Sequence, residues 1–323
     1  MGIDKILSEL EEGLTGNIQN DMNFLREQGV KYRDHEASKE INMAIGELSL
    51  RVLSNKKKIS KAELEKRKNI INTNYYKAEQ FAKVGMYKES KRLLEEAIRY
   101  IPYKENAGKY IFSFASAVEI WIYSMYFKPN FEITQSDSDN SSIYRLLGYV
   151  NIRLNNYNEA LKALQSSLIW NPVSIYTIVE IAEINRRNWR YEDCYNLLVN
   201  ALNFAKTNQE LAVCYFNLAH YYSDIKDYET SVILYQVSDS LCKNKQIDNE
   251  LSNLKVKFGV NIEKRSNGEI IEYLKMKKIQ LGASDLVIEA LRSLGGQAKK
   301  NNSLTVYKYC KELYAELTGK ELI

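Results

Sequence analysis

The sequence predicts an all-α protein, organised as a solenoid of stacked helical hairpins. Three observations support this prediction. Residues 144–172 have the spacing of two short antiparallel helices, and the same spacing returns along the chain at steps of about 34 residues. Only three prolines and 14 glycines occur among the 323 residues, which leaves little room for flexible linkers between separate domains. One elongated helical body is therefore expected.

The stretch 144–172 predicts one hairpin with a tight turn. Asn155 and Asn156 stand at that turn, and asparagine accepts turn and left-handed backbone conformations. Gly148 and Ala160 are small, so we expect the two helices to approach closely there. Leu147, Gly148, Asn151 and Leu154 are spaced three or four residues apart, which places them on one face of the first helix. A single hairpin cannot bury such a face alone, so neighbouring copies are needed.

Copies of this pattern lie on both sides of the first one. From Tyr157 to Tyr191 is 34 residues and from Tyr191 to Tyr228 is 37, and each of these aromatic residues follows a predicted turn. The step and the pattern of small and aromatic positions resemble the tetratricopeptide repeat (TPR) family. This resemblance covers roughly half of the chain and implies a right-handed α-solenoid. Within a solenoid region at 61–245, it places repeats at about 71–104, 141–174, 175–208 and 212–245.

The two ends of the chain are expected to be helical without forming regular repeats. Residues 1–60 contain amphipathic stretches that predict an N-terminal helical bundle. Residues 246–323 predict a degenerate repeat followed by C-terminal capping helices. The terminal unit of a solenoid needs one polar face because no neighbour covers it, and Lys and Glu alternate with the last apolar positions.

The regular spacing fails at 105–140. Lys109–Phe127 contains seven aromatic residues and predicts a helix in the place of a degenerate repeat. We expect this helix to be buried in the protein and not in a membrane, because Glu119 near its middle would be costly in lipid. Thr134–Ser142 is polar without an apolar anchor and predicts a mobile loop. Strands anywhere in 71–245 would overturn the expectation of a continuous helical stack.

Charge and cysteine usage exclude several classes of protein. The 45 basic and 41 acidic residues are interspersed and give a net charge of +4, whereas nucleic-acid-binding surfaces cluster their lysines and arginines. No uninterrupted apolar stretch is long enough to span a membrane, and the first residues are too charged for a signal peptide. The four cysteines show neither CxxC pairing nor metal spacing, so we expect buried, reduced thiols and a cytoplasmic protein. No nucleic acid, membrane, metal or cofactor is expected as a partner.

Catalytic motifs are not recognisable. The two histidines, His35 and His220, lie outside any nucleophile, metal or phosphate motif. No Gly-rich phosphate loop occurs. The sequence therefore predicts that the protein is not an enzyme and points to a binding surface.

The TPR resemblance implies where a partner would bind. In this family the first helix of each repeat lines the concave side of the superhelix, which forms the peptide-binding groove. The groove positions carried onto this sequence include Tyr75, Glu79, Lys83, Ile152, Glu183 and Asp224. Those predicted to bind the peptide are Arg145, Tyr149, Arg153, Tyr176, Arg186, Arg187, Phe216 and His220. Arginine suits carboxylates and aromatic rings bury apolar side chains, so a protein or peptide with acidic groups is expected. The alternative is that these arginines pair with Glu180, Glu183 or nearby acids and only solvate the inner face.

Two function classes follow from the resemblance. The first is a non-enzymatic scaffold or adaptor that binds proteins or peptides in its groove. The second is a peptide-responsive regulator, similar to those of Gram-positive bacteria, with the N-terminal bundle as its effector interface. Recognition of chaperone tails, known in another branch of the family, is not expected. Glu180 replaces an asparagine of that carboxylate clamp and would repel a carboxylate.

Overall fold

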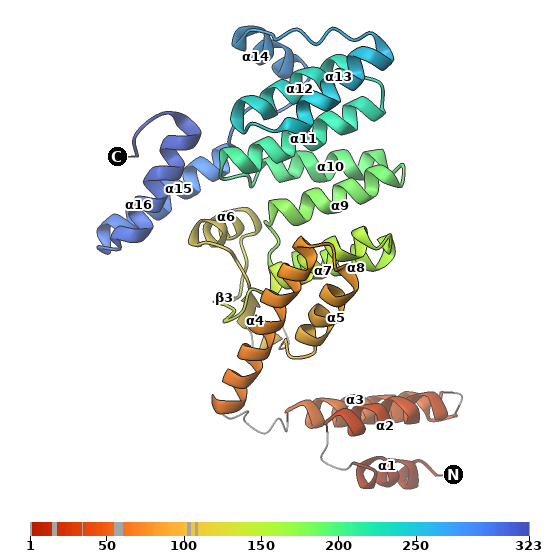
Figure 1. Ribbon diagram of the computed structural model, residues 1–323. Coiled ribbons are helices and arrows are strands. Elements are labelled where there is room, and N and C mark those ends of the chain that lie inside the picture. Colours follow the sequence, from red (N-terminus) through yellow and green to blue (C-terminus); the bar gives the residue numbers. More distant parts are fainter. Residues whose placement is uncertain are drawn as a thin grey trace. The chain divides into compact units, whose positions relative to one another are not determined.

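A computed structural model describes residues 2–14, 18–33, 35–54, 61–101, 105–106 and 109–322. In these ranges the chain forms sixteen helices and one sheet of three short strands (Figure 1). The prediction of an essentially all-helical protein is confirmed. The chain divides into two compact units, Met1–Arg67 and Lys68–Ile323. Positions 55–60, at the predicted end of the N-terminal bundle, and Pro102 lie outside the described residues.

The first unit has its own hydrophobic core. Its helices are α1 (Ile3–Glu12), α2 (Ile18–Lys31) and α3 (Ser38–Ser54). Ile6 and Leu10 are one helical turn apart on α1 and are almost fully buried, together with Leu25 of α2 and Ile41 of α3. The apolar stripes of the three helices therefore cover one another.

The second unit is built mainly from pairs of antiparallel helices. Neighbouring helices are in contact within each pair and between one pair and the next, and in the first pair Ser90 Oγ donates to the Ala78 carbonyl at 2.8 Å. Figure 1 shows the pairs stacked side by side. The four pairs are α4 (Lys61–Lys83) with α5 (Tyr87–Ile98), α7 (Asn140–Arg153) with α8 (Tyr157–Trp170), α9 (Ile175–Arg187) with α10 (Tyr191–Leu202), and α11 (Asn208–Asp224) with α12 (Tyr228–Leu241). The helices that follow are α13 (Lys245–Phe258), α14 (Asn267–Met276), α15 (Asp285–Lys300) and α16 (Leu304–Thr318).

The close approach of α7 and α8 depends on a glycine. A Cβ atom added at Gly148 would lie 2.5 Å from the side chain of Leu164 and 3.4 Å from the carbonyl oxygen of Ala160. Ala160 and Leu164 are themselves fully buried. The expectation that the two helices approach closely at Gly148 and Ala160 is confirmed.

Six helices end in the same turn. In each, one residue has a left-handed backbone, with φ between 55° and 80°. The amide of the next residue donates a hydrogen bond of 2.8–2.9 Å to the carbonyl five residues earlier, as in the Schellman motif. The six left-handed residues are Gly85, Asn155, Trp189, Lys226, Lys278 and Asn302. The left-handed turn expected at Asn155 is therefore confirmed, and the first four turns each lie two residues before a tyrosine that begins a helix.

The segment between the first two helix pairs departs from the prediction. It contains β1 (Glu105–Asn106), β2 (Lys109–Phe112), α6 (Ala117–Phe127) and β3 (Glu132–Gln135). β2 pairs antiparallel with β1 and parallel with β3. A single helix over Lys109–Phe127 is therefore wrong for its first residues, where alternating aromatic and β-branched side chains favour a strand. The stack of helix pairs is interrupted here and is not a continuous helical solenoid.

The polar stretch Thr134–Ser142 is not the loop without an anchor that its composition suggests. Its first residues belong to β3, and Asn140 begins α7 fully buried. The amide of Asn140 donates to Ser113 Oγ at 3.2 Å, and the Gln135 side chain donates to the Phe114 carbonyl at 2.8 Å. The segment is anchored because the Ser113 hydroxyl and the Phe114 carbonyl, which directly follow β2, accept these hydrogen bonds.

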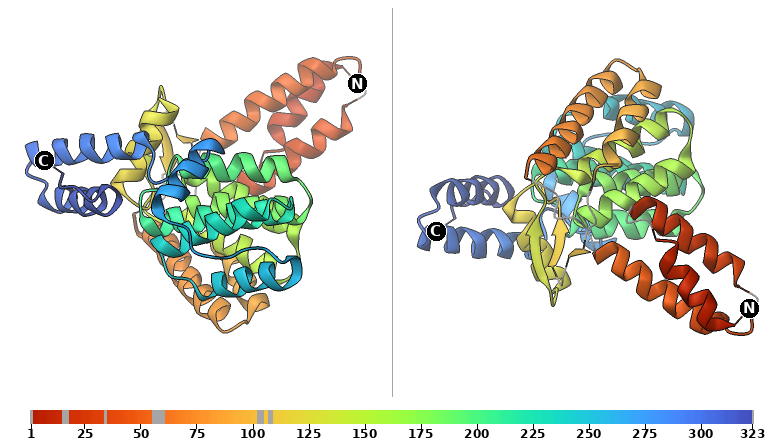
Figure 2. Two further views of the ribbon diagram at one scale, coloured as in Figure 1. Left: turned by 90° about the horizontal axis from the view of Figure 1, so that it is seen from above. Right: turned by 90° about the horizontal axis from the view of Figure 1, so that it is seen from below.

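Helix α6 joins the stack through charges as well as through apolar contacts. The Lys206 ammonium, between α10 and α11, lies 2.8 Å from Glu119 Oε1 on α6 and 2.6 Å from Glu210 Oε1 on α11. All three side chains are at most 8 % exposed. Helix α6 also contacts α15, and Figures 1 and 2 both show the α15–α16 hairpin next to α6.

The cysteines follow the prediction only in part. Cys194, Cys214 and Cys310 are buried free thiols, and burial raises the pKa of Cys194 to about 12 and that of Cys310 to about 11. Cys242, just after α12, is exposed, so the expectation of four buried thiols is wrong at this position. Among the described helices, none is long and apolar enough to cross a membrane.

Candidate functional site

The predicted binding residues lie on three adjacent helices, which we call the first-helix surface. It consists of Arg145, Tyr149 and Arg153 on α7, Tyr176, Glu180, Glu183, Arg186 and Arg187 on α9, and Phe216, His220 and Asp224 on α11. Two ion pairs cross between these helices. Arg145 Nη1 lies 3.1 Å from Glu180 Oε1, and Arg186 Nη1 bonds to Asp224 Oδ2. The structure therefore brings the predicted residues of all three helices together.

Glu180 is the most unusual acid of this surface. Its Oε1 accepts from Arg145, whose guanidinium also lies 5.9 Å from the centre of the Tyr176 ring. Its Oε2 is buried and has no hydrogen-bond partner among the described residues. Burial raises the pKa of Glu180 to about 7, although Arg145 acts in the opposite direction. The carboxylate is thus half-satisfied and poised to titrate near neutral pH.

Glu183 holds two of the predicted arginines at once. Its Oε2 lies 2.7 Å from Arg186 Nε, and its Oε1 lies 2.7 Å from Arg187 Nε. Burial disfavours the charged form of Glu183, but the hydrogen bonds from the two arginines outweigh burial and lower its pKa. Arg186 is also bonded to Asp224, so its guanidinium is largely occupied inside the protein.

The fourth predicted arginine has an aromatic partner. Arg153 Nε donates to the hydroxyl of Tyr87 at 3.1 Å, and the Tyr87 and Tyr149 rings meet edge to face with centres 6.4 Å apart. Three of the four arginines are thus paired with carboxylates of the chain and the fourth with a tyrosine. The internal pairing named in the alternative interpretation is therefore present, and an acidic partner would have to share these arginines.

Phe216 and His220 belong to an aromatic cluster on α11 and α12. His220 Nδ1 and the Tyr235 hydroxyl are 3.0 Å apart, and the rings of Phe216 and His220 meet edge to face at 4.6 Å. Burial lowers the pKa of His220, with Arg186 acting in the same direction, so the imidazole is neutral at pH 7. Phe216 also lines a small pocket of about 190 Å³ near Cys242.

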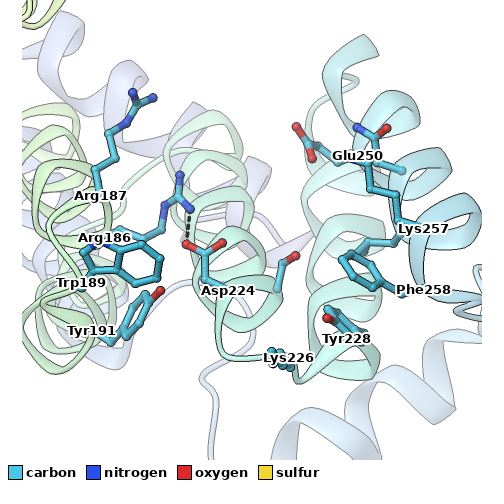
Figure 3. Close-up of a pocket in the computed structure, with 13 residues that line it drawn as sticks. Arg186, Arg187, Trp189, Tyr191, Asp224, Lys226, Tyr228, Glu250, Lys257 and Phe258 are labelled. Carbon is cyan, nitrogen blue, oxygen red and sulfur yellow. Dashed lines mark hydrogen bonds and ion pairs between the residues drawn. The ribbon is translucent and has the colours of Figure 1, made fainter.

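A larger pocket of about 480 Å³ lies where the turns of the helix pairs meet α13, and we call it the turn pocket (Figure 3). The predicted residues Arg186 and Arg187 line it. Asp224, a groove position of the resemblance, also lines it. Sequence reasoning missed the other residues, which are Trp189, Tyr191, Ser223, Lys226, Tyr228, Glu250, Asn253, Leu254, Lys257 and Phe258. One signal was present in the sequence. Counting back two residues from Tyr191 and Tyr228 gives Trp189 and Lys226, where the matching turns have Gly85 and Asn155.

The described residues include no group of three or more His, Cys, Asp or Glu side chains that could hold a metal ion. No family model matches the sequence, and a comparison with curated proteins finds no match. The class of protein is therefore defined by its fold and by the surface described above. It is an all-helical protein of stacked helix pairs, in which one surface combines exposed aromatic rings with internally paired arginines.

Proposed function

We propose that this protein is a non-enzymatic scaffold or adaptor of the TPR type, which binds a protein or peptide on its first-helix surface. The helix pairs, their step of 34 to 37 residues and their shared turn geometry support this assignment. In the proposal the pairs form a right-handed superhelix, and the strands β1–β3 with α6 are an insertion between the first and second repeats.

The observation that carries the proposal is the alignment of α7, α9 and α11 by ion pairs that leave aromatic rings exposed. Arg145 and Glu180 join α7 to α9, while Arg186 and Asp224 join α9 to α11. Tyr149 and Tyr176 on the same surface remain 37 % and 36 % exposed. Rigid, partly exposed aromatic side chains are the residues that most often dominate binding energy.

The paired charges give this surface a defined shape before a partner arrives. An arginine held by its own carboxylate loses little side-chain entropy on binding, so pre-organisation favours association. Arg145 uses Nη1 for Glu180, and a partner carboxylate can bind to the remaining N–H groups of the guanidinium.

Affinity capture with matched variants tests the proposal. Proteins captured by the wild type are compared with those captured by Tyr149→Ala and Tyr176→Ala. Tyr309→Ala is the control, because Tyr309 on α16 is likewise 37 % exposed but lies outside the first-helix surface. A partner lost in the first two variants and kept in the control supports the proposal. Identical captured sets in all four proteins would exclude this surface.

A peptide-responsive regulator is the second candidate, and one observation favours it. Residues 1–67 form a separate compact unit with its own buried core around Ile6, Leu10 and Leu25, as an independent effector module would require. Hydrogen exchange in α1–α3, measured with and without a peptide bound to the second unit, distinguishes the two candidates. Changed exchange supports the regulator, and unchanged exchange supports the scaffold.

A further inference from the structure

We infer that the turn pocket anchors a peptide segment in which an aromatic side chain lies next to a carboxylate. The inference rests on the proposed function, because it assigns to the pocket one defined part of the partner that the neighbouring first-helix surface binds. It depends on the backbone of two lining residues, on the aromatic walls and on the charges of the pocket.

The backbone at Trp189 and Lys226 is unfavourable for these residue types. Both have a left-handed conformation, with φ of 61° and 66°, at the turn position where Gly85 and Asn155 stand in other helix pairs. A bulky residue with positive φ is strained, and such strain concentrates at functional sites. The Trp189 side chain is also 79 % exposed, so burial in the protein does not compensate for the strain. Lysine adopts the same conformation at Lys278, outside the pocket, so the backbone of Lys226 does not by itself indicate a site, whereas a strained and exposed tryptophan favours a contact with a ligand.

Two pairs of aromatic rings form the walls of the pocket. On one side, the rings of Trp189 and Tyr191 meet edge to face at 6.1 Å. On the other side, Phe258 stacks on Tyr228 at 4.6 Å and remains 54 % exposed. Figure 3 shows the two pairs flanking the turn that carries Asp224 and Lys226. The volume of about 480 Å³ lies within the usual range of ligand pockets, and these walls suit an aromatic side chain.

The charges of the pocket favour an acidic neighbour for that ring. Arg186, Arg187, Lys226 and Lys257 line the pocket, against Asp224 and Glu250. Asp224 is already bonded to Arg186, whereas Lys226 and Lys257 make no ion pair with any described residue. Glu250 disfavours a carboxylate close to it. The carboxylate of the peptide is therefore expected beside Lys226 or Lys257 and away from Glu250, where it would neutralise a cation that has no ion pair with the described residues.

A displayed library of random decapeptides, selected on the full-length protein, tests the inference. We expect enriched peptides to carry Trp, Tyr or Phe within two residues of Asp or Glu. Their affinity should fall by about tenfold or more in Lys226→Glu/Lys257→Glu and in Trp189→Gly, because each removes one recognition element. Lys255→Glu, on the same helix as Lys257 but outside the pocket, should leave the affinity unchanged.

The outcomes separate this inference from the proposed function. Enriched peptides that lack the acidic and aromatic pair, or that bind the pocket variants as well as the wild type, overturn the inference. If those peptides nevertheless lose affinity for Tyr149→Ala and Tyr176→Ala, the first-helix surface remains the binding site. A selection that enriches no peptide contradicts both. Circular dichroism and thermal melting of each variant show whether a loss of binding comes from unfolding.

Discussion

Lys206 Nζ lies 2.8 Å from Glu119 Oε1, although 87 residues separate the two in the sequence. The second oxygen of Glu119 accepts from the Asn171 side chain at 2.8 Å and from the Ala115 amide at 2.7 Å. Both oxygens of Glu210 are also bonded, to the ammonium and to the backbone amide of Lys206. A single buried cation thus holds α6 against the start of α11 and fixes the strand-bearing segment to the stack of helix pairs.

Replacing Lys206 with methionine should be strongly destabilising. The change leaves two carboxylates buried without a counter-charge, and breaking a buried ion pair from one side costs about 3–5 kcal/mol. Urea unfolding measures this free energy. Lys243→Met is the control, since its pair with Asp239 has a lysine 84 % exposed and contributes at most about 1 kcal/mol. Similar costs for the two variants would contradict the structural role of Lys206.

Gly148→Ala should also lower the free energy of unfolding, by about 1–3 kcal/mol, because the new methyl group overlaps Leu164 where α7 and α8 approach closely. Gly296→Ala on α15 is the matched change. No atom lies within 4 Å of its added Cβ, and alanine favours a helix by about 1 kcal/mol over glycine. Denaturant midpoints of the two variants should therefore move in opposite directions.

Glu180 should make stability depend on pH in the neutral range. Its pKa is about 7 in the folded protein, against 4.5 for an ordinary glutamate, so the folded state binds the proton more tightly. The resulting stabilisation is fully present below about pH 4.5 and is lost as the pH rises through 7.

Glu180→Gln isolates this effect because the amide does not titrate. The free energy of unfolding of the wild type minus that of the variant should decrease by about 2 kcal/mol between pH 5 and pH 8. A difference that stays constant across this range would show that the carboxylate is not buried as the structure indicates.

Trp189→Gly should stabilise the protein while it weakens the proposed peptide binding. Glycine adopts a left-handed backbone without strain, so relief of the strain should contribute about 1 kcal/mol to the free energy of unfolding. Asn155→Gly, at the matching turn, should gain only a few tenths of a kcal/mol, since asparagine tolerates this conformation. Thermal melting ranks the two variants. A destabilised Trp189→Gly would mean that the tryptophan serves the fold instead.

One thiol of the native protein should react much faster than the other three. Cys242 is exposed, whereas the other cysteines are buried and the pKa values of all three are raised by burial. Titration with a disulfide reagent at pH 8 should therefore show a rapid phase of a single equivalent. Cys242→Ser should abolish this phase, and a second rapid equivalent in the wild type would contradict the burial of the others.

Much of the helical architecture could be predicted because it depends on local signals. The turn at Asn155 and the small pair Gly148 and Ala160 were predictable from residue type and spacing alone. The strands were not, since β2 depends on pairing with β3, more than twenty residues away in the sequence. The buried position of Asn140 likewise depends on a hydroxyl of Ser113 that only the folded chain brings near.

The candidate site could be predicted only as far as helix positions determine it. Arg145 and Arg186 were found on the expected helices, but their bonds to Glu180 and Asp224 cross between helices and depend on the packing distance. The turn pocket was missed because Lys257 and Phe258 come from α13, a region without a recognisable repeat.

The six matching turns can each accommodate different residue types at the left-handed position. Their hydrogen bonds involve only backbone atoms, so glycine, asparagine, lysine and tryptophan all occupy the same bend. A mutation there changes what the edge of the protein presents to solution and leaves the interior as it was. The surface presented at these turns can therefore be altered by single substitutions, and the residue of one turn should be accommodated by the backbone of another.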